Sequence, residues 1–265
     1  GLAVLVFFAT VALAAPLLAP YRPSLQLDIV DLQNRPPTWL HPLGTDLYSR
    51  DLWSRIVYGA RVSLSIGTLG MLLAVGVGAL VGAIAGYFRS WVDAVLMRLV
   101  DVGLAVPRIF IVLMAIALWQ RLGVASLVLL LGLTGWFPTS RLVRAEVLSV
   151  RERPYTDAAR VLGAGPWRVI ARHLLPNAAA PLIVSAALSI GNMMLLEAAL
   201  SFLGAGVHPP DPSWGNMIAD GRDQLATAPW TTLFPGLAIA LVVMALNAVA
   251  DALRDALDPR TAAVS

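Results

Sequence analysis

The feature that most constrains this chain is a series of apolar runs, each about twenty residues long, the length of helix that crosses a bilayer. Hydrophobic residues make up 58% of the 265 residues and charged residues 13%, against about 45–50% and about 25% in a soluble domain. These values exclude an intrinsically disordered chain and argue against a water-soluble enzyme domain. The sequence therefore predicts an all-α polytopic membrane protein.

Six runs are candidate transmembrane helices: 1–19, 62–86, 99–119, the stretch between Arg121 and Arg141, 178–202 and 231–250. The first has neither a basic start nor an A-x-A-type cleavage site, so we interpret it as an anchor from which the initiator methionine has been trimmed. Residues 21–61 carry several prolines and charges of both signs, which predicts an aqueous segment. The glycines of the second run predict close helix packing.

Residue usage excludes several kinds of function. All nineteen basic residues are arginines, whereas a P-loop ATPase and a Schiff-base enzyme both need a lysine. Cysteine is absent, which excludes disulfides, thiolate metal sites and cysteine nucleophiles. The three histidines are far apart in the sequence, so no metal site is predicted.

The arginines also predict an orientation. Eleven lie on the side that contains 87–98, 141–177 and the tail from Asp251, and seven lie on the other side. Seven of the eleven fall between Arg141 and Arg172. By the positive-inside rule this side is cytoplasmic, which places both termini in the cytoplasm. We interpret the net charge of +3 as loop charge that orients the helices, and no nucleic-acid partner is predicted.

The loop at 154–176 has an unusual pattern. It predicts a short helix over 155–162, a stop at Gly163 and Gly165, and a second helix that starts at Pro166, because proline suits the first helical position. On composition alone, an amphipathic helix in the lipid headgroup layer is an equally good interpretation.

Its letters D-A-A-x-x-x-G, then nine residues, then H-x-L-P resemble the "EAA" loop of permease subunits of binding-protein-dependent ABC importers. The matching residues are Asp157, Ala158, Ala159, Gly163, Leu175 and Pro176, with Tyr155 beside them. Asp157 replaces the usual glutamate and keeps its charge, and His173 replaces the usual isoleucine. The resemblance implies a coupling helix that docks on a separate ATPase subunit.

Segments 41–64, 197–217 and 251–260 are similar to segments of dipeptide, oligopeptide and nickel permeases, most of all to the dipeptide-type C subunit. The resemblance implies a type I ABC importer permease fold in the bacterial cytoplasmic membrane, with six transmembrane helices and a coupling helix between the fourth and fifth. Residues 1–61 would then form the first transmembrane helix and an extracytoplasmic segment, and 62–265 the permease domain.

The implied function is a non-catalytic subunit that forms half of the pore of a di- or oligopeptide importer. The implied partners are the lipid bilayer, a second homologous permease, one or two ATPases that hold ATP and magnesium, and an extracytoplasmic peptide-binding protein. No cofactor is expected on this chain. Nickel, glutathione or another small solute are alternative substrates, because related permeases share these loops.

Two polar residues in the predicted spans are candidates for the translocation path. Arg108 lies nine residues, about 13 Å, beyond Leu99, where a lone charge costs at least about 2.5–3.5 kcal/mol and tends to face a cavity. Pairing with carbonyls of another helix, or reaching back to the interface, is the alternative. Asn192 could face the path or bridge helices. Glu197 is expected near the outer interface, in a local pairing or capping role.

The loop at 204–229 is rich in proline, glycine and aspartate and contains Trp214. Pro209, Pro210 and Trp214 are therefore candidates for contact with a binding protein, and a structural plug over the helix ends is the alternative.

Two other classes of function are weaker. An intramembrane enzyme predicts a G-x-S-x-G serine, an H-E-x-x-H pair or paired aspartates, and the sequence contains none of them. A stand-alone secondary transporter predicts internal repeats and midplane carboxylates, and the apolar runs hold almost no carboxylates.

Overall fold

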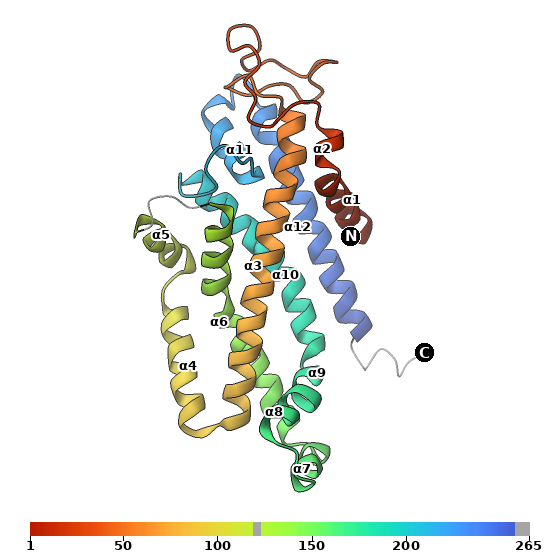
Figure 1. Cartoon of the computed structure of the whole chain (residues 1–265), viewed down its shortest axis with the longest axis vertical. Helices are drawn as coiled ribbons and strands as arrows, with labels where there is room; N and C mark the ends of the chain where they lie inside the picture. Colours follow the sequence, from red (N-terminus) through yellow and green to blue (C-terminus); the bar gives the residue numbers. More distant parts are fainter. Residues whose placement is uncertain (119–122, 258–265) are drawn as a thin grey trace. The chain divides into compact units, whose positions relative to one another are not determined.

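The computed structural model describes residues 1–118 and 123–257, and within them the regular secondary structure is helical apart from an isolated bridge between Thr45 and Asp51. The long helices are α3 (Leu52–Phe88), α6 (Val124–Arg151), α10 (Ala179–Phe202) and α12 (Trp230–Leu257). The shorter elements are α1 (Leu2–Leu13), α2 (Ala15–Leu18), α4 (Ser90–Ala105), α5 (Arg108–Leu118), α7 (Pro154–Val161), α8 (Pro166–Val169), the π-helical turn η1 (Ile170–Leu174), α9 (Leu175–Asn177), α11 (Trp214–Gly221) and the 3-10 turn η2 (Arg222–Gln224) (Figure 1).

The all-α prediction is confirmed. Among the described residues, the four long helices are each long and apolar enough to cross a membrane. The helices α4 and α5 pass the same test only as a pair, bent by 85°, and α1 is apolar but shorter than a span. Six transmembrane helices therefore stay a prediction, and residues 119 and 121, which bound two of the predicted runs, lie outside the described residues.

The break between α4 and α5 follows from Pro107. Proline disfavours helical dihedrals in the residue before it, and Val106 is extended, with φ −103° and ψ 130°. The third predicted run is thus two helices with a sharp bend between them.

The chain forms two compact units. Unit 1 comprises 1–69, 113–128 and 190–249, and unit 2 comprises 70–112, 129–189 and 250–265. The boundary predicted after residue 61 is of another kind, because it separates the first span and the segment after it from a transport domain. The two packing units do not test it, so it stays a prediction.

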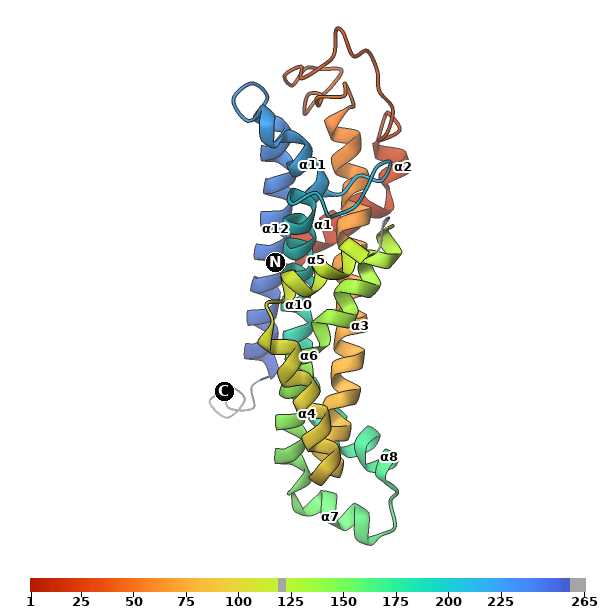
Figure 2. The same ribbon diagram turned by 90° about the vertical axis from the view of Figure 1, so that its left-hand side faces the viewer.

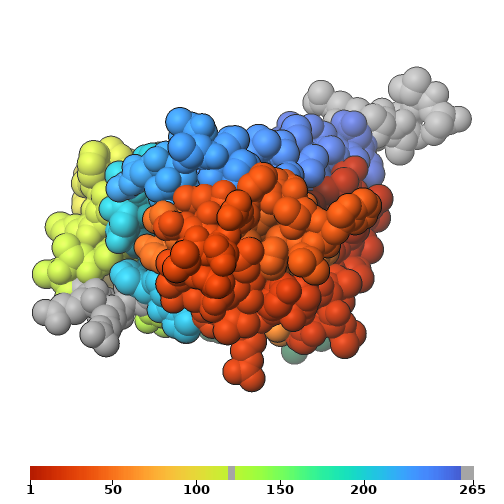
Figure 3. Space-filling view, turned by 90° about the horizontal axis from the view of Figure 1, so that it is seen from above, coloured from red at the N-terminus to blue at the C-terminus, as the bar shows by residue number. Residues whose placement is uncertain are grey.

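In unit 1, the core joins α1, α11 and parts of α3, α10 and α12 around Trp214, which is fully buried. The indole packs edge-to-face on Phe8 with ring centroids 5.4 Å apart, and its N–H donates to the carbonyl of Ile56 at 3.0 Å. Seen from above, the segment between α2 and α3 covers this end of unit 1 beside the stretch that contains α11 (Figure 3).

In unit 2, α3 and α6 pack almost backbone to backbone. Gly78, Gly82 and Gly86 repeat at four-residue spacing on α3, and a Cβ on any of them would come within 3 Å of α6 atoms. Such repeats of small residues let membrane helices approach closely. The packing predicted from the glycines is therefore confirmed at these three positions. Asp93 of α4 also accepts two hydrogen bonds from the Arg144 guanidinium of α6, at 2.5 and 2.6 Å.

We predict that Gly82→Ala destabilises the protein whereas Gly76→Ala does not. A Cβ at position 82 would lie 2.9 Å from the Val143 Cβ and 3.0 Å from the Arg144 nitrogen, and at position 76 it would meet nothing within 4 Å. Overpacking of this kind costs about 1–3 kcal/mol. Thermal unfolding in detergent would measure the difference, and equal midpoints for the two variants would contradict the close contact.

Candidate functional site

The loop between α6 and α10, which resembles a coupling loop, is two short helices joined by a turn (Figure 2). Both helices begin with proline, at Pro154 and Pro166, where its missing N–H costs nothing. After α7, Gly163 adopts φ +82°, its N–H donates to the carbonyl of Arg160, and the N–H of Ala164 donates to that of Ala159. This is a Schellman ending, which favours glycine at the position with positive φ.

This loop is anchored in unit 2 by a buried apolar cluster. Val169, Ile170 and Leu174 pack with side chains of α3 and α6, namely Ala83, Val143, Val147 and Val150. The hydroxyl of Thr156, which is also buried, donates to the carbonyl of Val150 at 3.0 Å. Movement of the loop is therefore tied to the ends of two long helices.

The opposite side of the loop exposes large apolar side chains. Val161 and Leu162 are each 87% exposed and Trp167 is 60% exposed. Large apolar residues gathered at an exposed turn are typical of a surface that binds a partner. Sequence reasoning selected Gly163 but missed these three residues. Their position beside a glycine turn is the signal that could have identified them.

The predicted residues of the loop are distributed around this surface. Tyr155, Asp157, Ala158, Gly163 and Pro176 are exposed, and Ala159 and Leu175 are partly buried. The Asp157 carboxylate lies 2.9 Å from the Arg160 guanidinium, so its charge is balanced within α7.

Arg108, the first candidate for the translocation path, is partly buried at the start of α5. Its guanidinium donates to the carbonyl of Leu131 and, at 3.3 Å, to the hydroxyl of Thr134, both on α6. This is the carbonyl pairing that the sequence analysis gave as the alternative. Asn192 is exposed on α10. Whether either residue lines a path stays a prediction.

Glu197, near the end of α10, is buried and has local partners. The hydroxyls of Ser201 and Ser213 both donate to its Oε1 atom, at 2.8 and 2.7 Å. A Cβ at Gly215 would lie 2.8 Å from Oε2, so glycine lets α11 approach the carboxylate. The expected local pairing of Glu197 is therefore present.

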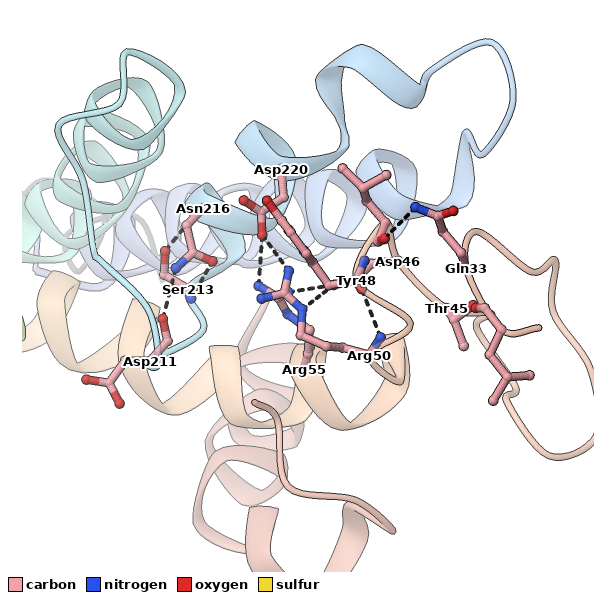
Figure 4. Close-up of polar contacts among 12 residues, drawn as sticks. Gln33, Thr45, Asp46, Tyr48, Arg50, Arg55, Asp211, Ser213, Asn216 and Asp220 are labelled. Atoms are coloured by element: carbon pink, nitrogen blue, oxygen red, sulfur yellow. Dashed lines mark hydrogen bonds and ion pairs between the residues drawn. The ribbon is translucent and has the colours of Figure 1, made fainter. Parts of the chain in front are cut away.

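A network of charged side chains in unit 1 lies next to α11, which follows the loop at 204–213 (Figure 4). Asp46 contacts Arg50 at 2.7 Å and Arg55 at 2.6 Å, and Asp220 of α11 contacts the same arginines at 2.8 and 3.2 Å. Burial raises the pKa of Asp46 and of Asp220, and the guanidinium of Arg50 opposes the rise in both. The network ties α11 to the start of α3 and to the segment before it.

The loop that leads into α11 is also held by hydrogen bonds. The hydroxyl of Ser213 accepts from the backbone of Asn216, and the Asn216 amide accepts in return from the backbone of Ser213, both at 3.0 Å. This reciprocal pair caps α11. Pro209 and Pro210 are exposed. The side chain of Trp214 is buried in the core of unit 1, so it does not form part of the loop's surface.

Comparisons with known proteins agree with this arrangement. Residues 78–263 match the family model "Binding-protein-dependent transport system inner membrane component". A putative peptide transport system permease protein of Brucella suis biovar 1 (strain 1330) is 42% identical over 262 residues, which is 98% of this chain and 86% of that protein. The dipeptide transport system permease protein DppC of Alkalihalophilus pseudofirmus is 41% identical over 267 residues, which is 98% and 84% of the two chains.

The fold is shared with a solved structure. An inward-facing structure of the MetNI methionine ABC transporter covers 77% of this chain and 96% of its own, with a TM-score of 0.61 and 16% identity. At this identity the likeness shows the fold alone. With the family match and the close relatives, it follows that the chain belongs to the binding-protein-dependent transport system inner membrane components, as a permease component of an ABC importer.

Proposed function

We propose that this chain is one of two homologous permease subunits that form the pore of a di- or oligopeptide importer. The relatives named for peptide and dipeptide transport, each about 41–42% identical over nearly the whole chain, support the substrate class. Nickel and glutathione are the alternative substrates within the same machinery. A stand-alone secondary transporter is not supported by the family.

In this proposal the chain crosses the membrane six times, with α1 as the first span, the bent pair α4–α5 as the third and both termini in the cytoplasm. The distribution of arginines supports the orientation. The loop at 154–176 then lies in the cytoplasm between the fourth and fifth spans, and the loop at 204–229 lies outside.

The observation that carries the mechanism is the two-sided construction of the loop at 154–176. One side is fixed to α3 and α6 by buried residues, and the other exposes Val161, Leu162 and Trp167. A separate ATPase subunit, which would hold ATP and magnesium, covers this apolar surface. Its movement during ATP hydrolysis pushes on the anchored loop and thereby on the long helices, so this chain needs no catalytic group or cofactor of its own.

We predict that the double variant Val161→Ser, Leu162→Ser loses its ATPase partner. Burying a large apolar side chain contributes about 1.5–3 kcal/mol, so two losses weaken association by well over tenfold. Co-purification and peptide-stimulated ATP hydrolysis would measure the effect. Leu225→Ser removes an equally large exposed side chain outside the loop and serves as the control. Normal association of the double variant would contradict the docking role.

The exposed loop at 204–211 is proposed as a contact for the extracytoplasmic binding protein. Its support is the stiffness of the loop, held by Asn216, whose amide donates to the carbonyl of Asp211 at 2.9 Å. A stiff surface loses little conformational entropy on binding.

We predict that Pro209→Glu raises, by fivefold or more, the concentration of binding protein needed to stimulate ATP hydrolysis, because it adds a charge that the contact must desolvate. The basal rate should not change. Ala226→Glu, in an exposed position after η2, is the matched control. If both variants respond to binding protein as the wild type does, the loop is not the contact.

A further inference from the structure

Unit 2 contains an open groove of about 680 Å³ that no predicted site residue lines. Leu142, Val184 and Leu188 give it an apolar floor, and Glu146, Ser185 and Arg254 add polar groups from α6, α10 and α12. Its volume lies in the range of sites that bind small molecules, about 300–1,000 Å³, and such sites combine apolar walls with a few polar groups.

The two charged residues of the groove, Glu146 and Arg254, have side chains that are available to a ligand. Within residues 1–118 and 123–257, neither the carboxylate of Glu146 nor the guanidinium of Arg254 has a hydrogen bond or an ion pair. Four other acidic residues of unit 2 are paired with arginines: Asp93 with Arg144, Asp101 with Arg141, Glu152 with Arg89, and Asp157 with Arg160. In the orientation predicted from the arginines, Glu146 and Arg254 both lie beyond the apolar runs on the cytoplasmic side, so the groove is placed at the cytoplasmic ends of α6 and α12, where a path would leave the membrane.

We propose that this groove holds the peptide in transit, with Glu146 binding its terminal ammonium group and Arg254 its terminal carboxylate. This inference rests on the proposed function. Every unmodified linear peptide carries these two termini, whatever its sequence. A groove that binds the ends with charges and leaves the side chains against an apolar floor therefore accepts many peptides.

The chemistry of the two residues fits this ligand. Arginine presents a planar fork that binds a carboxylate with two parallel hydrogen bonds, and a carboxylate accepts from a primary ammonium. A divalent metal ion would be attracted by Glu146 but repelled by Arg254. The pair therefore favours a zwitterion over nickel, the alternative substrate.

The binding test uses the complete importer in proteoliposomes, with its binding protein and trialanine as the probe. The chain has no cysteine, so Ser185→Cys places a single thiol in the groove for a maleimide reagent. We expect trialanine to slow labelling at least fivefold. Adding Glu146→Gln should abolish protection by trialanine, and N-acetyl-trialanine should protect weakly even with Glu146 present. Ser149→Cys, exposed on α6 outside the groove, should not be protected.

The transport test compares uptake with ATP hydrolysis in the same vesicles. Glu146→Gln and Arg254→Gln should each lower trialanine uptake per ATP hydrolysed at least fivefold. Complex assembly and stimulation by the binding protein should stay within twofold of the wild type. Glu152→Gln and Arg98→Gln, which change exposed charges of unit 2 outside the groove, are the matched controls and should leave uptake unchanged.

Two results would overturn the inference. If the wild type imports trialanine while the thiol at position 185 stays unprotected, and its labelling changes only with the zwitterionic lipid content of the vesicles, the groove is a lipid site. If the wild-type complex imports no peptide at all, the proposed function fails, and the assignment of the groove fails with it. Uptake by the wild type distinguishes the two cases.

Discussion

The proposed mechanism depends on the buried cluster that joins α8 and η1 to α3 and α6. Val169, Ile170 and Leu174 are buried against these helices, so the loop at 154–176 cannot shift without moving them. The close approach of α3 and α6 through Gly78, Gly82 and Gly86 makes the two helices one mechanical element. In the proposed function, a docked ATPase transmits its push through this cluster to helices long enough to cross the membrane.

Unit 1 combines an apolar core with a network of charged and polar groups. The network of Asp46, Arg50, Arg55 and Asp220 and the capped start of α11 hold the loop at 204–213 in place. The proposed contact with a binding protein benefits from this arrangement, because the loop is ordered before the partner arrives. Trp214 completes the unit by filling the space between α1, α3 and α11.

Features set by local chemistry could be predicted from the sequence. Apolar run length located the long helices, Pro166 marked the start of α8, and Gly163 marked the turn. Features set by packing between distant segments could not. The partner of Arg108 lies 23 residues away, and the burial of Trp214 in a loop rich in glycine and proline depends on α1 and α3. Arg254 and Glu146 line one groove although more than a hundred residues separate them.

The proposed docking role places the loop at 154–176 against an ATPase subunit in the cytoplasm. The most direct measurement is cross-linking from Leu162→Cys, the only thiol the chain would then contain, in the complete transporter in membranes. We predict a cross-linked product that contains the ATPase, and protection of the thiol from a membrane-impermeant reagent added outside. A cross-link to the binding protein, or labelling from outside, would contradict both the docking role and the orientation.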